Sequence, residues 1–378
     1  LSPTPKTPVT IEESLTTMLK QARVTALTLG TAAMLTLTGC ASWDNTSTTN
    51  AALQKELQEG DIQDIANATG PARVDSLAEV EPVTDSPSPA LPVELTDADG
   101  NDVVVDDVSR IVALDLYGTY TKTLRGLGLG ENIIGRTVSS TEESLKDIPS
   151  VTAGGHDINV EAVLNLDPSL VIVDHSIGPA SAIDQIRAAG VTTVVMSPER
   201  SIETIGQDIR NVAGVVGLPE EGETLAQRSE DELAKAQETI AGIIPDEPLR
   251  MAFLYARGTG GIFYILGDED GSSDLIEALG GTDIASENGI GSPTPASAEA
   301  LVELNPQVFV MMNAGLESTG DIAGLLDRPG VAQTDAGKNQ RVLTLPDGDS
   351  LAFGPQTAEM LLRAAKGLYL GDESGNSN

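Results

Sequence analysis

Two stretches of the chain, residues 159–173 and 298–311, repeat one pattern. Each starts with a helical run rich in Glu, Ala, Val and Leu, breaks at Asp167-Pro168 or Asn305-Pro306, and continues as a short apolar strand. A helix that leads into a buried strand is typical of βαβ units, which build parallel sheets. Because the pattern occurs twice, the sequence predicts two similar lobes.

The segments around the repeats indicate how the lobes divide the chain. With 378 residues, 40% of them apolar, the chain is long enough for two cores. The predicted fold class is α/β, with two Rossmann-like lobes that have parallel central sheets and are joined by one long helix. The predicted parts are a first lobe at 92–201, a linking helical region at 202–246, a second lobe at 247–372 and a tail at 373–378.

The first 39 residues have the features of a lipoprotein signal peptide. Lys20 and Arg23 precede an uncharged run that ends in Leu37-Thr38-Gly39-Cys40. A basic start, an apolar centre and small residues at the end are typical of secretory signals. The last four residues resemble a bacterial lipobox, which implies cleavage before Cys40 and acylation of its thiol. Residues 40–91, rich in Ser, Thr, Asp, Asn and Pro, are predicted to form a disordered tether to the membrane.

Composition excludes several kinds of function. Acidic residues number 57 against 22 basic ones, and such a surface repels nucleic acid. Cys40 is the only cysteine, so an internal disulfide framework is excluded, and His156 and His175 are the only histidines. We find no nucleophile elbow, P-loop or metalloprotease motif, and we therefore expect a protein that is not an enzyme.

A strand predicted at residues 250–257 ends in an unusual pair of side chains. Tyr255 and Arg257 point to one face of an extended chain, and open α/β sheets bind ligands at such strand ends. A cation next to a phenol favours the phenolate, which is a hard ligand for ferric iron. The alternative is a packed tyrosine beside an arginine that reaches solvent, and both interpretations stay open at this point.

Several motifs together resemble the substrate-binding proteins of ABC importers for haem, iron-siderophores and cobalamin. The resemblance covers residues 92–370 and implies a periplasmic-binding-protein-like fold. It also implies capture of a ligand between the lobes and its delivery to an ABC permease with its ATPase. The motifs are Arg110-Ile-Val-Ala-Leu-Asp, Gly126-Leu-Gly-Leu-Gly, Ile134-Gly-Arg, the segment 159–168, Glu277-Ala-Leu-Gly-Gly and Phe353-Gly-Pro-Gln-Thr.

Within that family, the chain bears a closer resemblance to the haem-binding lipoproteins of corynebacteria and their relatives. The similarity lies in Gly154-Gly155-His156, in residues 254–258 and in residues 350–357. It implies that ferric haem b is bound between His156 and Tyr255, with Arg257 supporting the tyrosine. His175 is a weaker candidate, and the residues that could also line the pocket are Tyr117, Tyr120, Phe353 and Gly354.

The resemblance also implies a location and partners. We expect a lipid-anchored protein on the extracytoplasmic face of a Gram-positive, actinobacterial cell membrane, which could receive haem from other surface proteins. Glu277 fits a permease-docking residue in the second lobe. Lys122 stands where the first lobe would have its glutamate, with Glu142 and Glu143 as substitutes. The alternatives are a ferric-siderophore or cobalamin carrier, and a haem sensor or adhesin without transport.

Overall fold

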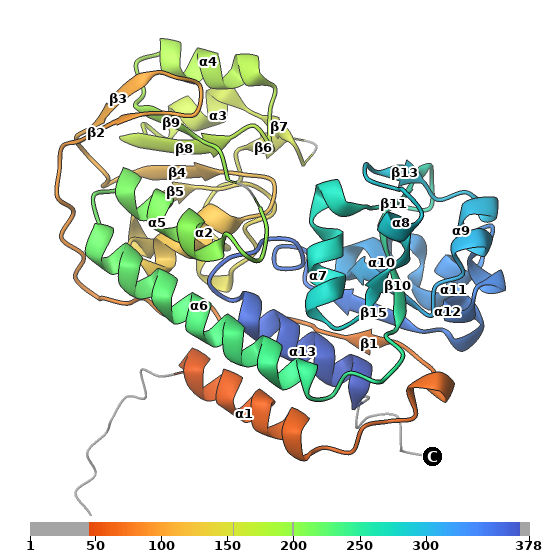
Figure 1. Ribbon diagram of the computed structural model, residues 1–378. Coiled ribbons are helices and arrows are strands. Elements are labelled where there is room, and N and C mark those ends of the chain that lie inside the picture. Colours follow the sequence, from red (N-terminus) through yellow and green to blue (C-terminus); the bar gives the residue numbers. More distant parts are fainter. Residues whose placement is uncertain (1–44, 154, 199, 371–378) are drawn as a thin grey trace, which may run out of the picture. The chain divides into compact units, whose positions relative to one another are not determined.

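The computed structural model describes residues 45–153, 155–198 and 200–370. Each of the two predicted lobes has a central sheet flanked by helices, and a pair of helices runs between them (Figure 1). This confirms the α/β class, in which each lobe is built from alternating strands and helices.

The sheet of the first lobe is parallel, with strand order β5-β4-β8-β9. Its middle strands are apolar on both faces and buried throughout, as parallel strands covered by helices must be. A hairpin of β2 and β3 precedes this sheet. The elements are β2 (Val93–Thr96), β3 (Asp102–Val105), β4 (Ile111–Leu114), α2 (Thr119–Gly126), η2 (Gly130–Asn132), β5 (Ile133–Gly135), η3 (Glu143–Leu145), β6 (Thr152–Ala153), β7 (Asp157–Ile158), α3 (Val160–Asn165), β8 (Leu170–Asp174), α4 (Ala180–Ala188) and β9 (Thr193–Met196).

The sheet of the second lobe is mixed, with strand order β1-β15-β14-β10-β11-β13 and β12 beside β10. Its strands β1, β15, β14, β10 and β12 run parallel, as predicted for the central sheet, while β11 runs antiparallel to both β10 and β13. The glycine-rich turn between β10 and β11 allows the chain to fold back directly. The elements are β10 (Arg250–Arg257), β11 (Ile262–Ile265), η4 (Asp268–Asp270), α7 (Ser272–Ala278), β12 (Thr282–Asp283), α8 (Ile284–Glu287), β13 (Thr294–Pro295), α9 (Ala298–Leu304), β14 (Val308–Met312), α10 (Asn313–Thr319), α11 (Asp321–Leu326), η5 (Val331–Gln333), α12 (Asp335–Asn339), β15 (Val342–Leu345) and α13 (Thr357–Tyr369).

The connection between the lobes is helical. It consists of α5 (Ile205–Val215) and α6 (Pro219–Ala241). Pro219 starts α6 at a position where its missing N–H is not needed. Two glutamates follow in the first turn, where their negative charges interact favourably with the positive end of the helix dipole. With 23 residues, α6 is about 35 Å long.

Residues 45–91, which we call the N-terminal strap, are folded. The prediction of a disordered tether is wrong for this part. The strap contains α1 (Asn45–Glu59), η1 (Ile65–Asn67) and β1 (Ala72–Arg73). Its α1 lies beside α13 and α6, and β1 adds a parallel strand to the second-lobe sheet next to β15 (Figure 1). The prediction used the composition of the whole segment, which is mostly polar. It did not take account of a few apolar residues that are buried in the structure, namely Leu53, Leu57, Val74 and Val80.

Leu57 provides a test of how much the strap contributes to stability. Its side chain is 1% exposed, in the apolar contact between α1 and the long helices. We expect Leu57→Ala to lower the free energy of unfolding by about 2 to 3 kcal/mol, through lost burial and the cavity left behind. The measurement is chemical denaturation. Lys55→Ala on the exposed side of α1 is the control, with an expected change within about 0.5 kcal/mol, and equal effects of the two variants would show that the strap does not pack stably.

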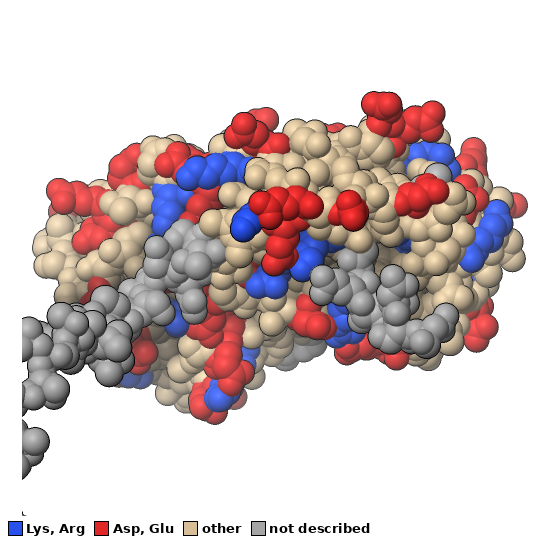
Figure 2. Space-filling view, turned by 90° about the horizontal axis from the view of Figure 1, so that it is seen from below, with Lys and Arg blue, Asp and Glu red and all other residues tan. Residues whose placement is uncertain are grey.

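The surface reflects the acidic composition. Figure 2 shows acidic side chains spread across the face seen from below, with basic side chains scattered between them. Among the helices of residues 45–153, 155–198 and 200–370, none is long and apolar enough to cross a membrane. The predicted signal peptide and Cys40 lie outside the described residues, as does the predicted tail.

Candidate ligand-binding site

A cleft of about 930 Å³ is lined by residues of both lobes. The cleft lies at the carboxyl ends of strands from both sheets. Its lining includes residues at or just after the ends of β4 and β5 in the first lobe and of β14 and β15 in the second. This is the edge at which open α/β sheets bind ligands. Much of the lining is apolar, contributed by Leu116, Val138, Ile262, Leu266, Pro293, Met312, Ala314, Leu351 and Ala352.

Tyr255 and Arg257 lie at the end of β10 and both line the cleft, as the alternation of the strand predicted. The Arg257 guanidinium carbon is 4.7 Å from the centre of the Tyr255 ring. Its Nη2 donates a hydrogen bond to Oδ1 of Asp347 at 3.0 Å, and its Nη1 donates to the carbonyl of Ala256 at 3.1 Å. The cation is therefore held against the phenol by partners on its own strand and on the segment after β15.

His156 reaches the same cleft from the first lobe. It lies between the two short strands of the β6–β7 hairpin, and its carbonyl accepts a hydrogen bond from the N–H of Gly178 at 3.1 Å. Its side chain is exposed and lines the cleft together with Gly155. His175 lies elsewhere on the first lobe, with its Nε2 2.7 Å from Asp99 Oδ1.

Tyr117 also lines the cleft, in front of a buried ionic cluster. The Arg200 guanidinium carbon lies 4.4 Å from the centre of the Tyr117 ring, and it forms ion pairs with Asp115 and Asp174. Burial raises the pKa of the Tyr117 phenol, and the nearby Arg200 opposes that rise only in part. The phenolate of Tyr117 is therefore harder to form than that of an ordinary tyrosine, so its ring suits packing against a ligand better than binding iron.

Three of the residues predicted for the pocket are not among those that line the cleft. Tyr120 is 2% exposed and donates a hydrogen bond to Asp174 at 2.7 Å. Phe353 and Gly354 border, with Tyr120, a small cavity of about 10 Å³ between α2 and α5. The lining of the cleft therefore does not support the prediction for these three residues, and for Tyr120 it favours packing in the core.

The residues considered for permease docking differ in exposure. Glu277 is exposed on α7, and Glu143 is exposed and paired with Lys146. In contrast, Lys122 is 1% exposed, and the Glu142 side chain is 6% exposed. Lys122 and Glu142 are therefore buried, so neither offers its charge to a partner on the surface.

The sequence did not indicate two of the residues that line the cleft. Tyr264 on β11 is the direct cross-strand neighbour of Tyr255, and Asp347 follows β15. A signal for Tyr264 was present, because an apolar, aromatic run follows a glycine-rich turn at 258–261, as in a hairpin. Nothing local distinguishes Asp347 from the many other acidic residues of the chain.

Comparison with known proteins gives a consistent result. A family model described as "Periplasmic binding protein" matches residues 111–348. A crystal structure of the heme binding protein HmuT is 65% identical and covers 82% of this chain and 100% of its own, with a TM-score of 0.81. Structures of HmuT have also been solved with an arginine, a histidine or a tyrosine replaced by alanine.

Two more distant proteins show similarity to the chain. The periplasmic heme-binding protein RhuT from Roseiflexus sp. RS-1, in apo form, is 35% identical and covers 70% of this chain and 98% of its own, with a TM-score of 0.65. The uncharacterized ABC transporter substrate-binding lipoprotein YvrC of Bacillus subtilis (strain 168) is 25% identical over 282 residues, which are 74% of this chain and 86% of YvrC.

Proposed function

Because this chain belongs to the periplasmic binding protein family, we propose that it captures ferric haem between its lobes and delivers it to an ABC permease. The observation that carries the proposal is the pairing of His156 and Tyr255. One lobe contributes an imidazole and the other a phenol to the lining of the same cleft, an arrangement that suits two axial ligands of one iron atom. Tyrosine and histidine are both known axial ligands of haem iron.

The rest of the cleft suits a porphyrin. A porphyrin is a broad apolar disc, and the cleft has aliphatic side chains from both lobes together with the rings of Tyr117 and Tyr264. Arg257 packs against the proposed iron ligand, with its guanidinium carbon 4.7 Å from the centre of the Tyr255 ring. The ligand is thus cargo, enclosed by apolar contacts and oriented by two bonds to its metal.

The relatives support this assignment of ligands. HmuT and RhuT are described as heme-binding proteins, and at 65% and 35% identity they resemble this chain over most of their length. The histidine, tyrosine and arginine replaced in HmuT are separated along its chain as His156, Tyr255 and Arg257 are separated here. This is the spacing expected if the three residues have the same places in both proteins.

The proposal includes the way the protein reaches its permease. We infer that Cys40 is acylated and holds the folded part at the extracytoplasmic face of the membrane, as the lipobox predicts and as the description of YvrC as a lipoprotein supports. A single acyl chain binds a membrane only weakly, so stable anchoring requires more than one. Glu277, exposed on α7, is the proposed docking residue of the second lobe.

A titration with hemin tests the function. We expect the purified protein to bind hemin with one saturable step and to give an intense Soret band with an additional phenolate-to-iron charge-transfer band. Iron-free protoporphyrin IX is the matched control, since it offers the same disc without a metal for His156 and Tyr255, and it is expected to bind more weakly. A folded protein that leaves the spectrum of free hemin unchanged would refute the proposal.

A further inference from the structure

The buried Lys122 connects the two lobes. It lies on α2 of the first lobe, with a side chain that is 1% exposed. Its Nζ donates a hydrogen bond of 2.7 Å to the carbonyl of Gly348, which lies in the second lobe after β15. It also donates to the carbonyl of Gly118 at 3.2 Å and lies 3.6 Å from Asp349 Oδ1. The ammonium group therefore bonds to both lobes at once.

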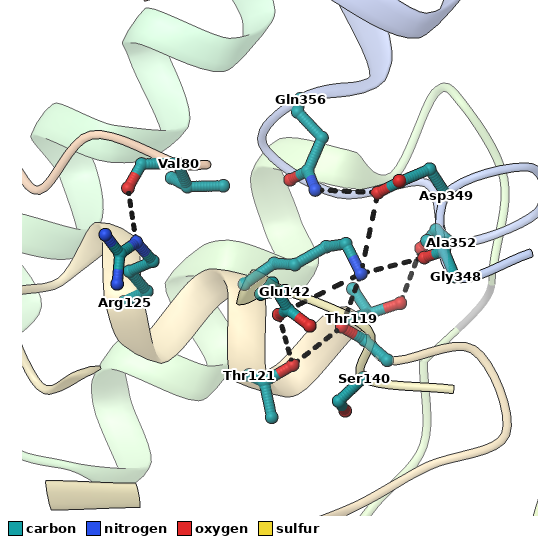
Figure 3. A network of polar contacts seen from close by, with 12 residues as sticks. Val80, Thr119, Thr121, Arg125, Ser140, Glu142, Gly348, Asp349, Ala352 and Gln356 are labelled. Carbon is teal, nitrogen blue, oxygen red and sulfur yellow. Dashed lines mark hydrogen bonds and ion pairs between the residues drawn. The ribbon is translucent and has the colours of Figure 1, made fainter. Parts of the chain in front are cut away.

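The segment between β15 and α13, residues 346–356, is held by more than this lysine. We call it the floor segment, because Asp347, Leu351 and Ala352 line the cleft. Thr119 Oγ1, one turn before Lys122 on α2, donates to the carbonyl of Ala352 at 2.5 Å. Within the floor segment, Gln356 Nε2 donates to Asp349 Oδ1 at 2.9 Å (Figure 3). Helix α2 thus fixes the floor segment at two points.

The lobes also come close together at Gly348, which bonds to Lys122. A side-chain methyl added at Gly348 would lie 2.4 Å from the carbonyl oxygen of Ser139 and 2.6 Å from Thr141 Oγ1, both in the first lobe. These distances are far below van der Waals contact, so the lobes can keep this spacing only with glycine at 348. The contact between the lobes therefore combines a polar bridge with a close backbone approach.

The same segment extends to the proposed iron ligand. Asp347 directly precedes Gly348 and accepts the hydrogen bond from Arg257 at 3.0 Å, and Arg257 lies over the Tyr255 ring. Asp347 Oδ2 also accepts from the N–H of Ala314 at 2.9 Å, which ties the segment to α10. A displacement of the floor segment relative to the first lobe would thus be transmitted to the residues around Tyr255.

We propose that Lys122 is a positioning residue for haem ligation, which holds the floor segment against the first lobe and thereby sets the separation between His156 and Tyr255. The inference rests on the proposed function. Two ligands on different lobes can bind one iron atom together only if the separation of the lobes brings both ligand atoms within bonding distance of the iron. A bridge of one ammonium group between main-chain carbonyls of both lobes fixes that distance, because hydrogen bonds tolerate little change in length.

The test uses two variants that disturb the contact in different ways. Lys122→Met removes the ammonium group and with it the bridge but keeps an unbranched side chain that is one atom shorter, and Gly348→Ala inserts a methyl group between the lobes without changing any charge. Both proteins are titrated with hemin and compared with His156→Ala, in which one ligand is absent. Lys146→Met, at an exposed lysine of the same lobe, and Gly214→Ala, at an open helical position, are the matched controls.

We expect both test variants to keep the phenolate-to-iron band and to shift their ferric spectrum toward that of His156→Ala, since the lobe that carries the histidine moves away. Haem release should become faster by about 10- to 100-fold, the usual effect of disturbing residues that orient a ligand. The controls should keep the spectrum of the unaltered protein.

Other results would overturn the inference. A folded Lys122→Met or Gly348→Ala protein with an unaltered spectrum and release rate would show that Lys122 does not set the ligand separation. Lys122→Met leaves Glu142 and Asp349 without their cation and could prevent folding, in which case Gly348→Ala decides. Failure of the proposed function is distinguishable, because the unaltered protein would then give no Soret shift with hemin.

Discussion

Replacing Tyr255 by alanine is expected to abolish the phenolate-to-iron band of the hemin complex and to weaken hemin binding by at least about 100-fold. Altering a residue that merely orients a metal ligand costs about 10- to 100-fold, and removal of the ligand itself should cost no less. His156→Ala should keep the band, because only the opposite face of the iron loses its ligand. Arg257→Ala should also keep it, since the phenol remains in place.

Tyr264→Ala is the matched control for Tyr255→Ala. The two tyrosines are direct cross-strand neighbours and line the same cleft, so each replacement removes one phenol ring from the same surface. We expect the band to survive in Tyr264→Ala. A folded Tyr255→Ala protein with the unaltered ferric spectrum would show that Tyr255 only packs, and loss of the band in Tyr264→Ala would transfer the role of ligand to Tyr264.

Arg200→Met should lower the free energy of unfolding by about 3 to 5 kcal/mol at neutral pH. The guanidinium of Arg200 lies 3.6 Å from Asp115 and also pairs with Asp174, and both carboxylates are buried. Removing the cation leaves two buried negative charges that lack their counter-ion. Haem binding should also weaken, because Tyr117, which lines the cleft, loses the guanidinium that packs on its ring.

The effect of Arg200→Met should depend on pH in a defined direction. Burial raises the pKa of Asp115 in the folded protein, and Arg200 opposes that rise. Without Arg200 the pKa rises further, while the pKa in the unfolded chain stays at its ordinary value. The folded variant then binds a proton that the unfolded chain does not, so it regains stability relative to the unaltered protein as the pH falls from 7 towards 5.

Denaturation curves at several pH values check this prediction. Arg210→Met is the control, because Arg210 also bridges two glutamates, at 2.7 Å each, but on the surface of α5 and α6. Its loss should cost less than about 1 kcal/mol. An Arg200→Met protein as stable as Arg210→Met would mean that the buried carboxylates are neutral in the folded state and need no cation.

The sequence predicted those features that repeat or that lie at strand ends. The helix, proline break and strand of residues 159–173 and 298–311 correctly indicated two lobes of one architecture. Tyr255 was placed in the cleft by the alternation of its strand, because parallel strands bring their carboxyl ends to one edge of a sheet. Each of these inferences needed only local pattern and one general rule of α/β folds.

Features that depend on distant parts of the chain could not be predicted. The strap was taken for a tether, because its ordering depends on burying Leu53 and Leu57 against helices far along the chain. Lys122 was compared with a docking residue of the family, yet it lies against Gly348 of the other lobe. A lysine in an amphipathic helix normally faces solvent, and only the meeting of the two lobes makes this position buried.

The pairing of β1 with β15 has a consequence for how the protein folds. The sheet of the second lobe contains a strand made before the whole first lobe, beside the strand made almost last, and α1 packs on the final helix α13. Contacts between residues so far apart in sequence form slowly, because a long loop must close first. During synthesis the first lobe can fold early, whereas the second lobe has to wait for the end of the chain. We therefore expect chains that stop before β15 to leave the strap unpaired and the second lobe unfolded.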